Sequence, residues 1–396
     1  MERIGIFGGT FNPPHVGHMQ AAKQALEALA LDRLLLIPDR IAPHKAMPAH
    51  SPTPQQRLQM LQIAAGDHPK LEVCDLELRR EGPSYTYITV EDLRRQYPED
   101  ELVLIMGTDM FLCFRSWRNP ERILACCSLA VLYRGEKGEI RSVDEQKAEM
   151  EAVGTKVYLI QNPVTAISST DLRRMLVFEC ADPFLPEAVG AYIRKHGLYG
   201  IRRNYRNLSM EELEQVVISL LKPSRVNHVL GCRDTAVELA RHWGANETDA
   251  ARAGILHDIT KALDGPLQLT LCAEYGTILD DFSTKYPKTL QALTGSLVAE
   301  RIFGENPAVV AAIYSHTTGK ADMNLLEKII YVADYMEPCR DFPGVERLRE
   351  LAYSDMDAAL KLGLEMTLEH LAHQGSEVSP QSREALAWLN SKNKPD

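Results

Sequence analysis

The sequence predicts an α/β domain built on a parallel, Rossmann-like sheet, followed by an all-α domain. Over the first half of the chain, short apolar runs alternate with longer helix-favouring runs, which is typical of parallel sheets covered by helices on both faces. From residue 210 onward the apolar residues recur with helical periodicity and without strand alternation. We therefore expect domains at residues 1–200 and 210–396, joined by a basic, polar linker at 201–209.

The strands of the first domain are predicted from buried apolar runs of strand length. They are expected at residues 3–7, 34–38, 71–76, 101–107, 128–133 and 156–161. Helices are expected to begin near residue 18 and to span residues 54–65, 86–96 and 144–153. Because ligands bind beyond the carboxyl ends of strands in such sheets, the loop after the first strand is a candidate site.

Composition and charge narrow the class of protein. The chain has 396 residues, a net charge of −10 and 45% hydrophobic residues, which suits a globular protein of two domains. The negative charge argues against non-specific nucleic-acid binding, and no apolar run approaches membrane-spanning length. We expect a cytoplasmic protein without a secretory or transit segment, with reduced cysteines, and with no nucleic-acid or membrane partner. An oligomer is compatible with the sequence.

The loop after the first strand carries the strongest motif of the chain. It reads Gly8-Gly9-Thr10-Phe11-Asn12-Pro13-Pro14-His15-Val16-Gly17-His18. The glycines let a ligand approach the backbone, and the helix that begins near His18 offers free N–H groups and a positive dipole end to a phosphate. His15 and His18 lie three residues apart and can face one anion, although isolated histidines at a helix start are more often surface or core groups.

This loop resembles the first motif of the nicotinate-nucleotide adenylyltransferases, members of the nucleotidyltransferase superfamily with a His-x-Gly-His motif. The resemblance covers residues 1–199. It implies an enzyme that transfers the adenylyl group of ATP to nicotinate mononucleotide, giving deamido-NAD and pyrophosphate, with Mg²⁺ on the ATP phosphates. It also implies catalytic roles for His15 and His18. The ATP-binding residues implied in this loop are Gly8, Gly9, Thr10 and Phe11.

A second phosphate clamp is expected where residues 167–174, Ile-Ser-Ser-Thr-Asp-Leu-Arg-Arg, open a helix after the last strand. Hydroxyls at this position are as often N-caps as ligands, but a helix start with Arg173 suits a phosphate. The run resembles the family's Ile-Ser-Ser-Thr-x-Ile-Arg motif, which implies a catalytic Arg173. The ATP ligands implied here are Ser168, Ser169 and Thr170.

A phosphate ligand is also implied after the second strand, where Lys45 lies in a Pro-His-Lys element like that of the family. Taken alone, Lys45 would be a solvated loop lysine. Arg57 and Arg134 match family positions too, but the sequence assigns them no role.

The acceptor site is suggested by two segments that resemble family motifs. Residues 82–87 match Gly-x-Ser-Tyr-Thr, and residues 107–109 with Trp117 match Gly-x-Asp…Trp. The resemblance implies that Thr86 and Trp117 hold the nicotinate carboxylate and ring, and an aromatic plane does stack well on a pyridinium. Asp109 would bind ribose hydroxyls. A core role for Trp117 and transfer to another phosphate acceptor are the alternatives.

The second domain contains a set of histidines and aspartates in apolar surroundings. They are His228, the adjacent pair His257-Asp258, His316 and Asp334. A buried aspartate beside a buried histidine is costly unless it is paired or bound to a metal. Mixed imidazole and carboxylate ligands suit Mn²⁺, Fe or Zn²⁺.

The order His…His-Asp…Asp is similar to that of HD-domain metal-dependent phosphohydrolases. Residues 253–261, 314–319 and 326–338 resemble motifs of the YqeK-type symmetrical diadenosine-tetraphosphate hydrolases. The resemblance implies hydrolysis of dinucleoside polyphosphates, giving two ADP from diadenosine tetraphosphate, at a di-metal site of iron or manganese. It implies that one metal is held by His228, His257, Asp258 and Asp334, and the second by His316. Lys261 would stabilise charge.

One position departs from this pattern. Gln291 stands where the family has a histidine, four residues before Gly295. Because an amide oxygen is a weaker, neutral ligand, the second metal is expected to be loosely held or absent. The alternatives for this domain are a non-catalytic module that binds nucleotide or metal, and hydrolysis of another nucleotide.

Overall fold

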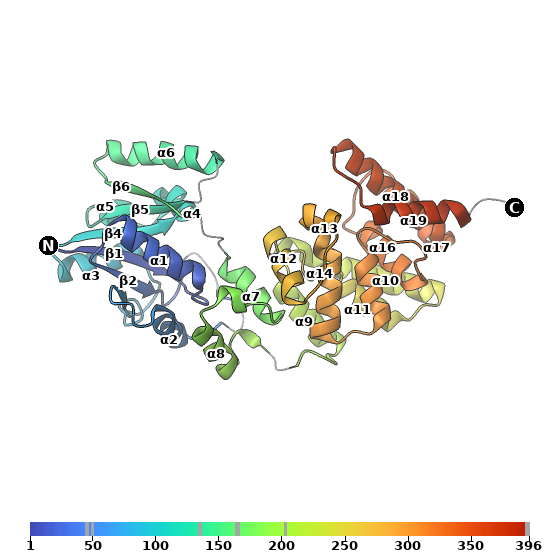
Figure 1. Cartoon of the computed structure of the whole chain (residues 1–396), viewed down its shortest axis with the longest axis horizontal. Helices are drawn as coiled ribbons and strands as arrows, with labels where there is room; N and C mark the ends of the chain where they lie inside the picture. The colour runs from blue at the N-terminus through green and yellow to red at the C-terminus, as the bar shows by residue number, and fades with distance from the viewer. Residues whose placement is uncertain (44–46, 49–50, 134–136, 163–166, 202–203, 393–396) are drawn as a thin grey trace. The chain divides into compact units, whose positions relative to one another are not determined.

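The computed structural model describes residues 1–43, 47–48, 51–133, 137–162, 167–201 and 204–392 (Figure 1). The chain divides into two compact units, Met1–Arg202 and Arg203–Asp396. Part of the predicted linker packs within the second unit, because Tyr205 is buried and its ring centroid lies 5.9 Å from that of Phe303.

The first unit is built on a six-stranded parallel sheet with the order β3-β2-β1-β4-β5-β6. Its strands are β1 (Arg3–Gly9), β2 (Arg33–Pro38), β3 (Leu71–Val73), β4 (Glu101–Gly107), β5 (Ser128–Tyr133) and β6 (Val157–Gln161). The predicted α/β fold is therefore confirmed. The chain order reverses between β1 and β4, which is where ligands bind in doubly wound sheets. β3 ends three residues before its predicted end, because the chain turns after it and the Leu78 N–H donates to the Asp75 carbonyl.

Helices cover both faces of this sheet (Figure 1). They are α1 (Val16–Ala28), α2 (Pro54–Ala65), α3 (Thr86–Gln96), α4 (Thr108–Leu112), α5 (Pro120–Leu124), α6 (Lys137–Ala152), α7 (Ser169–Val177) and α8 (Glu187–His196), with 3₁₀ turns η1 (Phe114–Ser116), η2 (Asp182–Phe184) and η3 (Leu198–Gly200). α6 begins seven residues before its predicted start, Asp144. The extra turns are largely polar, and of their two large apolar residues Ile140 is exposed and only Val143 is buried, so they carry little of a buried apolar face.

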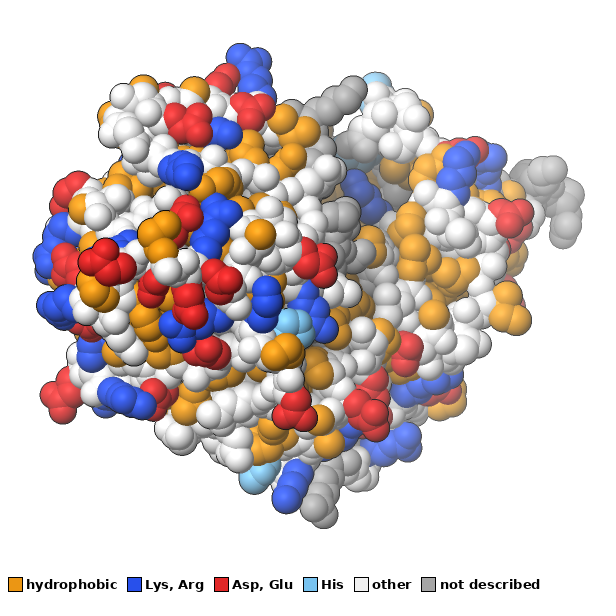
Figure 2. Space-filling view, turned by 60° about the vertical axis from the view of Figure 1, so that its left-hand side comes forward, with side chains coloured by type: hydrophobic (Ala, Val, Ile, Leu, Met, Phe, Trp, Pro, Cys, Tyr) orange, Lys and Arg blue, Asp and Glu red, His pale blue; other side chains and the backbone are white. Residues whose placement is uncertain are grey.

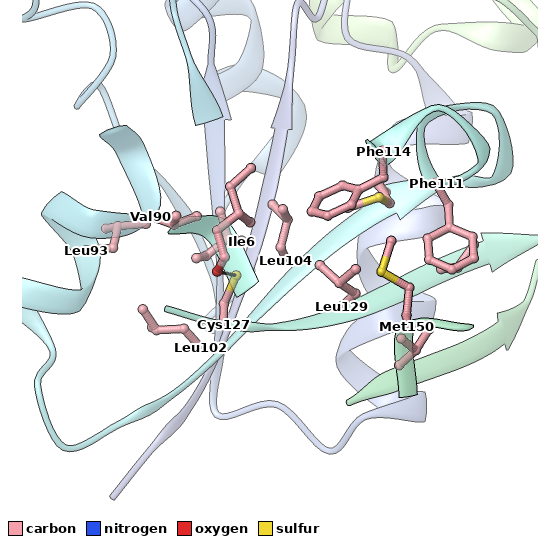
Figure 3. Packing of buried hydrophobic residues seen from close by; sticks show 14 of the residues in the cluster. Ile6, Val90, Leu93, Leu102, Leu104, Phe111, Phe114, Cys127, Leu129 and Met150 are labelled. Atoms are coloured by element: carbon pink, nitrogen blue, oxygen red, sulfur yellow. Dashed lines mark hydrogen bonds between the residues drawn. The ribbon is translucent and has the colours of Figure 1, made fainter. Parts of the chain in front are cut away.

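The alternation of side chains along the strands divides the core into two layers. Ile6 and Leu104 face α3 to α6, where Figure 3 shows them near Val90 and Phe114. Residues of opposite parity, such as Leu36 and Ile105, face α1 and α2. The sheet is thus buried on both sides, and ligands reach it at the ends of its strands.

The second unit is helical throughout its described residues, as predicted. Its elements are α9 (Met210–Leu220), η4 (Pro223–Arg225), α10 (Val226–Trp243), α11 (Glu247–Leu256), α12 (Gly265–Glu274), α13 (Asp281–Lys285), η5 (Pro287–Leu290), α14 (Gln291–Val298), the π-helical η6 (Ala299–Phe303), α15 (Pro307–Ser315), α16 (Leu325–Met336), α17 (Val345–Ser354), α18 (Met356–His373) and α19 (Pro380–Lys392). α10 packs closely on α11, where a Cβ at Gly254 would lie 2.7 Å from the Arg233 Cα. α10 also packs on α16, which brings together the helices that carry the predicted metal ligands.

Acidic and basic side chains are interspersed over the face shown in Figure 2. All eight cysteines are free thiols. Among the described residues, the helices are too short or too polar to cross a bilayer.

Candidate active sites

Two neighbouring cavities open at the carboxyl ends of β1 and β4. The first has a volume of about 630 Å³ and the second about 500 Å³. Predicted site residues in the first are His15, His18, Asp109, Ser168 and Ser169. Those in the second are Gly8, Gly9, Thr10, Thr86 and Trp117. Both cavities are bordered by Phe7, Gly107 and Met110, so a ligand in one would adjoin a ligand in the other.

The rings of His15 and His18 lie against each other at the start of α1, with centroids 3.6 Å apart and planes tilted by 33°. The backbone N–H of His15 donates to Nδ1 of His18 at 3.3 Å, so a neutral His18 ring carries its proton on Nε2 and can donate it to a ligand. Burial lowers the pKa of His15 to about 4 and that of His18 well below its usual range. Near pH 7 both rings of the free protein are therefore neutral, and they can act on an anion as hydrogen-bond donors.

Two arginines hold the loop between β1 and α1. Arg57 is fully buried and donates to the carbonyl of Thr10 at 2.6 Å and to Oδ1 of Asp39 at 3.1 Å. Arg173 donates from Nη1 to the carbonyl of Asn12 at 2.8 Å. Sequence reasoning gave Arg57 no role and missed Asp39, which also accepts from the Thr10 hydroxyl at 2.7 Å. These contacts fix the loop before a ligand arrives.

The first residues of α7 and its N-cap include one side chain that caps the helix and others that are available to a ligand or to Arg173. Ser168 is the N-cap, since its hydroxyl accepts from the Asp171 N–H at 3.0 Å and donates to the Asp171 carboxylate at 2.6 Å. Its hydroxyl therefore serves the helix, as the capping alternative predicted. The Thr170 hydroxyl accepts from Nη2 of Arg173 at 3.0 Å. Lys45 and Arg134 lie outside the described residues.

The predicted acceptor residues are placed in different cavities. Thr86 is the first residue of α3, so its N–H has no partner within the helix. Trp117 packs on Phe114, with ring centroids 5.2 Å apart, and also lines the second cavity, so packing on the core does not remove its ring from the cavity. Asp109 is exposed and borders the first cavity.

Glu77 is a buried carboxylate in the second cavity that sequence reasoning missed. The Thr89 hydroxyl donates to its Oε1 at 2.6 Å. Burial raises the pKa of Glu77. The sequence held no local signal for it, since its partner lies on α3.

In the second unit, four predicted metal ligands converge from α10, the end of α11 and α16. Nε2 of His228 lies 3.3 Å from Nε2 of His257 and 3.2 Å from Oδ1 of Asp334. Nε2 of His257 lies 3.6 Å from Oδ2 of Asp258. One ligand atom from each of His228, His257 and Asp258 lies within 4.8 Å of the others, so these residues could hold one metal ion.

The hydrogen bonds around this cluster fit a cation at its centre. Nδ1 of His228 lies 3.0 Å from a Glu337 carboxylate oxygen, and Nδ1 of His257 lies 2.7 Å from the Gly254 carbonyl. Since both partners accept, each Nδ1 donates a proton to its partner, and each Nε2 is the ring atom that faces the centre of the cluster. Burial lowers the pKa of His257 to about 4, which disfavours a proton there. A divalent metal at this point would be held by the two Nε2 atoms and the neighbouring carboxylates, and it would satisfy them together.

Two arginines that sequence reasoning missed border this cluster. Arg225 donates to Oδ2 of Asp258, and Arg340 donates to Oδ1 of Asp334 at 2.6 Å. Both are half-buried, so each guanidinium beside the cluster is partly open to solvent. Arg225 could have been suspected because it lies three residues before His228. Lys261 is exposed in the turn after Asp258.

His316 approaches the cluster from the other side of Asp258. Its Nε2 lies 3.7 Å from Oδ1 of Asp258 and 3.0 Å from the Thr317 hydroxyl. Gln291, at the start of α14, donates from its amide nitrogen to the same hydroxyl at 3.1 Å.

Each of the two units matches a family of known proteins. The sequence model of the cytidylyltransferase-like family matches residues 6–175, and that of the HD domain matches residues 225–339. A probable nicotinate-nucleotide adenylyltransferase of Geobacillus thermodenitrificans is 36% identical over 203 residues, which cover 88% of that protein and 51% of this chain. One from Pseudomonas syringae pv. tomato is 38% identical over 211 residues, which cover 94% of it and 50% of this chain. Through its first unit, the chain belongs to the nicotinate-nucleotide adenylyltransferase family.

The second unit is an HD domain. A predicted HD superfamily hydrolase involved in NAD metabolism from Clostridium acetobutylicum is 35% identical, with 47% of this chain and 99% of that chain covered and a TM-score of 0.46. The nicotinic acid mononucleotide adenylyltransferase of Plasmodium falciparum is 19% identical, with 51% and 99% covered and a TM-score of 0.41.

Proposed function

We propose that the first unit transfers the adenylyl group of ATP to nicotinate mononucleotide, giving deamido-NAD and pyrophosphate. Its family membership supports this reaction. The main structural support is a pair of adjoining cavities where the strand order reverses between β1 and β4. One cavity is lined by the histidine pair and the other by Thr86 and Trp117. A reaction between two nucleotides needs two such cavities with a common border.

The geometry suggests how the reaction proceeds. The triphosphate lies in the first cavity, where the Nε2–H of His18 and the free N–H groups at the start of α1 donate to its oxygens. The nicotinate ring lies against Trp117, and its carboxylate accepts from the Thr86 N–H. An oxygen of the mononucleotide phosphate attacks the α-phosphorus, and the bond to pyrophosphate breaks, so the protein needs no nucleophile of its own. Mg²⁺ on ATP neutralises part of the phosphate charge.

The test is to follow product formation by the full chain with ATP, Mg²⁺ and nicotinate mononucleotide, with nicotinamide mononucleotide and pantetheine phosphate as competing acceptors. We expect deamido-NAD to form with the highest kcat/KM. Preference for another acceptor would overturn the substrate assignment.

We also propose that the second unit is a metal-dependent phosphohydrolase that splits diadenosine tetraphosphate into two ADP. The metal-compatible cluster of the HD domain supports the reaction class. A bound metal would polarise a phosphate and lower the pKa of water. His228, His257, Asp258 and Asp334 would hold it, while Arg225, Arg340 and Lys261 offset the charge of a polyphosphate.

The choice of substrate rests on the sequence motifs, and it can be tested by incubating the full chain with Mn²⁺ or Fe²⁺ and diadenosine tetraphosphate. We expect ADP as the sole product. The matched control is His257→Ala, which should abolish hydrolysis and leave deamido-NAD synthesis unchanged. Metal binding without ADP release would instead identify a binding module.

A further inference from the structure

The two sides of Asp258 differ in how their polar atoms are satisfied. On the side of Oδ2, the Nε2 lone pairs of His228 and His257 face each other at 3.3 Å. Because Nδ1 of each ring donates to an acceptor elsewhere, the two Nε2 atoms do not satisfy one another, and a cation between them would satisfy both. On the side of Oδ1 the nearest imidazole is His316, at 3.7 Å.

The His316 side is already satisfied by hydrogen bonds. Nδ1 of His316 lies 2.6 Å from the Ile313 carbonyl, so this nitrogen carries the proton and Nε2 holds the lone pair. The Thr317 hydroxyl lies 3.0 Å from that Nε2 and donates to it. The lone pair that a metal would need is therefore used by a hydroxyl proton.

Gln291 fixes the direction of the Thr317 hydroxyl. Its amide nitrogen donates to Oγ1 of Thr317 at 3.1 Å, so the hydroxyl proton is free to point at His316. Gln291 and His316 are both buried, at 7% and 2% exposed, which makes the loss of either hydrogen bond costly. The group that Gln291 presents here is an amide N–H, which has no lone pair for a metal.

We propose that the HD domain of this chain binds a single divalent metal ion, between His228 and His257, and that the chain Gln291–Thr317–His316 closes the position for a second ion. This inference rests on the metal dependence proposed above. It assigns His316 a positioning role, in which it orders Thr317 and the neighbouring turn. The charge that a second ion would have neutralised then falls to Arg225 and Arg340.

The test measures metal stoichiometry and uses the full chain. Chelator-treated protein is titrated with Mn²⁺ without nucleotide, and bound metal is determined by elemental analysis and by electron paramagnetic resonance. We expect a single equivalent with the spectrum of an isolated ion. His257→Ala serves as the blank and should lose this equivalent, whereas His316→Ala should keep it. Gln291→His should add a second equivalent with a spin-coupled spectrum.

Two spin-coupled equivalents in the unmodified chain, one of which is lost in His316→Ala, would overturn the single-ion site while leaving a metal enzyme. No bound metal would reject metal dependence itself, and the inference with it. Thr317→Val gives a second test if Gln291→His does not fold, because removing the hydroxyl frees Nε2 of His316 and should allow weak binding of a second ion.

Discussion

Oε1 of Glu337 lies 3.0 Å from Nδ1 of His228, and Glu337 is only 1% exposed. The other oxygen of this carboxylate accepts from the Cys339 N–H at 2.7 Å. Gly231 leaves room for it, since a Cβ there would lie 2.6 Å from Oε2. The carboxylate is thereby fixed where it keeps a proton on Nδ1 and turns Nε2 of His228 toward the metal cluster.

Replacing Glu337 by glutamine should weaken metal binding. An amide holds the imidazole less firmly and makes it a poorer ligand, and loss of such a partner costs about 10–100-fold in metal affinity. Titration of the apo-protein with Mn²⁺ measures the effect. Glu346→Gln, at an exposed carboxylate paired with Arg349, is the matched control. Unchanged affinity in Glu337→Gln would show that His228 is oriented by packing alone.

Replacing Arg173 by alanine should slow adenylyl transfer. Its guanidinium reaches both the Asn12 carbonyl and Thr170, and so joins the loop of β1 to the start of α7. Loss of one preorganised donor to a charged transition state lowers kcat by about 10²–10³-fold. Steady-state kinetics of deamido-NAD formation measure this loss. Arg194→Ala, at an exposed arginine paired with Asp182, should leave the rate unchanged, and an equal loss there would point to a general effect of charge.

The histidine pair should make the stability of the first unit depend on pH. In the folded state the pKa of His15 is about 4, below its usual 6.5, so between these values the unfolded chain binds more protons. The free energy of unfolding therefore falls as pH decreases through this window, by about 2 kcal/mol at pH 5 for His15 alone. Urea unfolding of the full chain at pH 7 and pH 5, followed by a probe in the first unit, measures the change. In His15→Asn the pH dependence should be smaller. If the free energy of unfolding of His15→Asn changed with pH as much as that of the unmodified chain, groups other than His15 would cause the pH dependence.

Local motifs predicted the loop of β1 and the main metal ligands, because glycines, a helix start and adjacent histidines leave their signal within a few residues. The hydrogen bonds that position the site residues could not be predicted from local motifs. Arg57 meets Asp39, and Gln291 meets Thr317, across 18 and 26 residues of chain. Such pairings depend on how the helices and strands pack, and a single sequence holds no record of them.

Gly254 should tolerate no larger residue. A Cβ at this position would lie 2.7 Å from the Arg233 Cα, and a backbone atom cannot move aside as the end of a side chain can. Gly254→Ala should therefore force α10 and α11 apart and destabilise the second unit by about 1–3 kcal/mol. Urea unfolding followed by Trp243, at the end of α10, measures this. Gly190→Ala in α8, where the nearest atom is a side-chain nitrogen at 3.4 Å, is the control. A stable Gly254→Ala variant would show that the helices adjust at no cost.

The fluorescence of Trp117 should change when a ligand binds in the acceptor cavity and should not change when one binds in the first cavity. Its indole lines the second cavity and not the first, so nicotinate mononucleotide should quench its fluorescence while ATP leaves it largely unchanged. The measurement uses a variant in which Trp243 and Trp388 are phenylalanine, since these are the other two of the three tryptophans. Trp117→Ala should raise the KM for nicotinate mononucleotide about tenfold through loss of stacking, with little change in the KM for ATP. Equal changes in both KM values would mean that Trp117 supports the fold of the site and does not contact the ring.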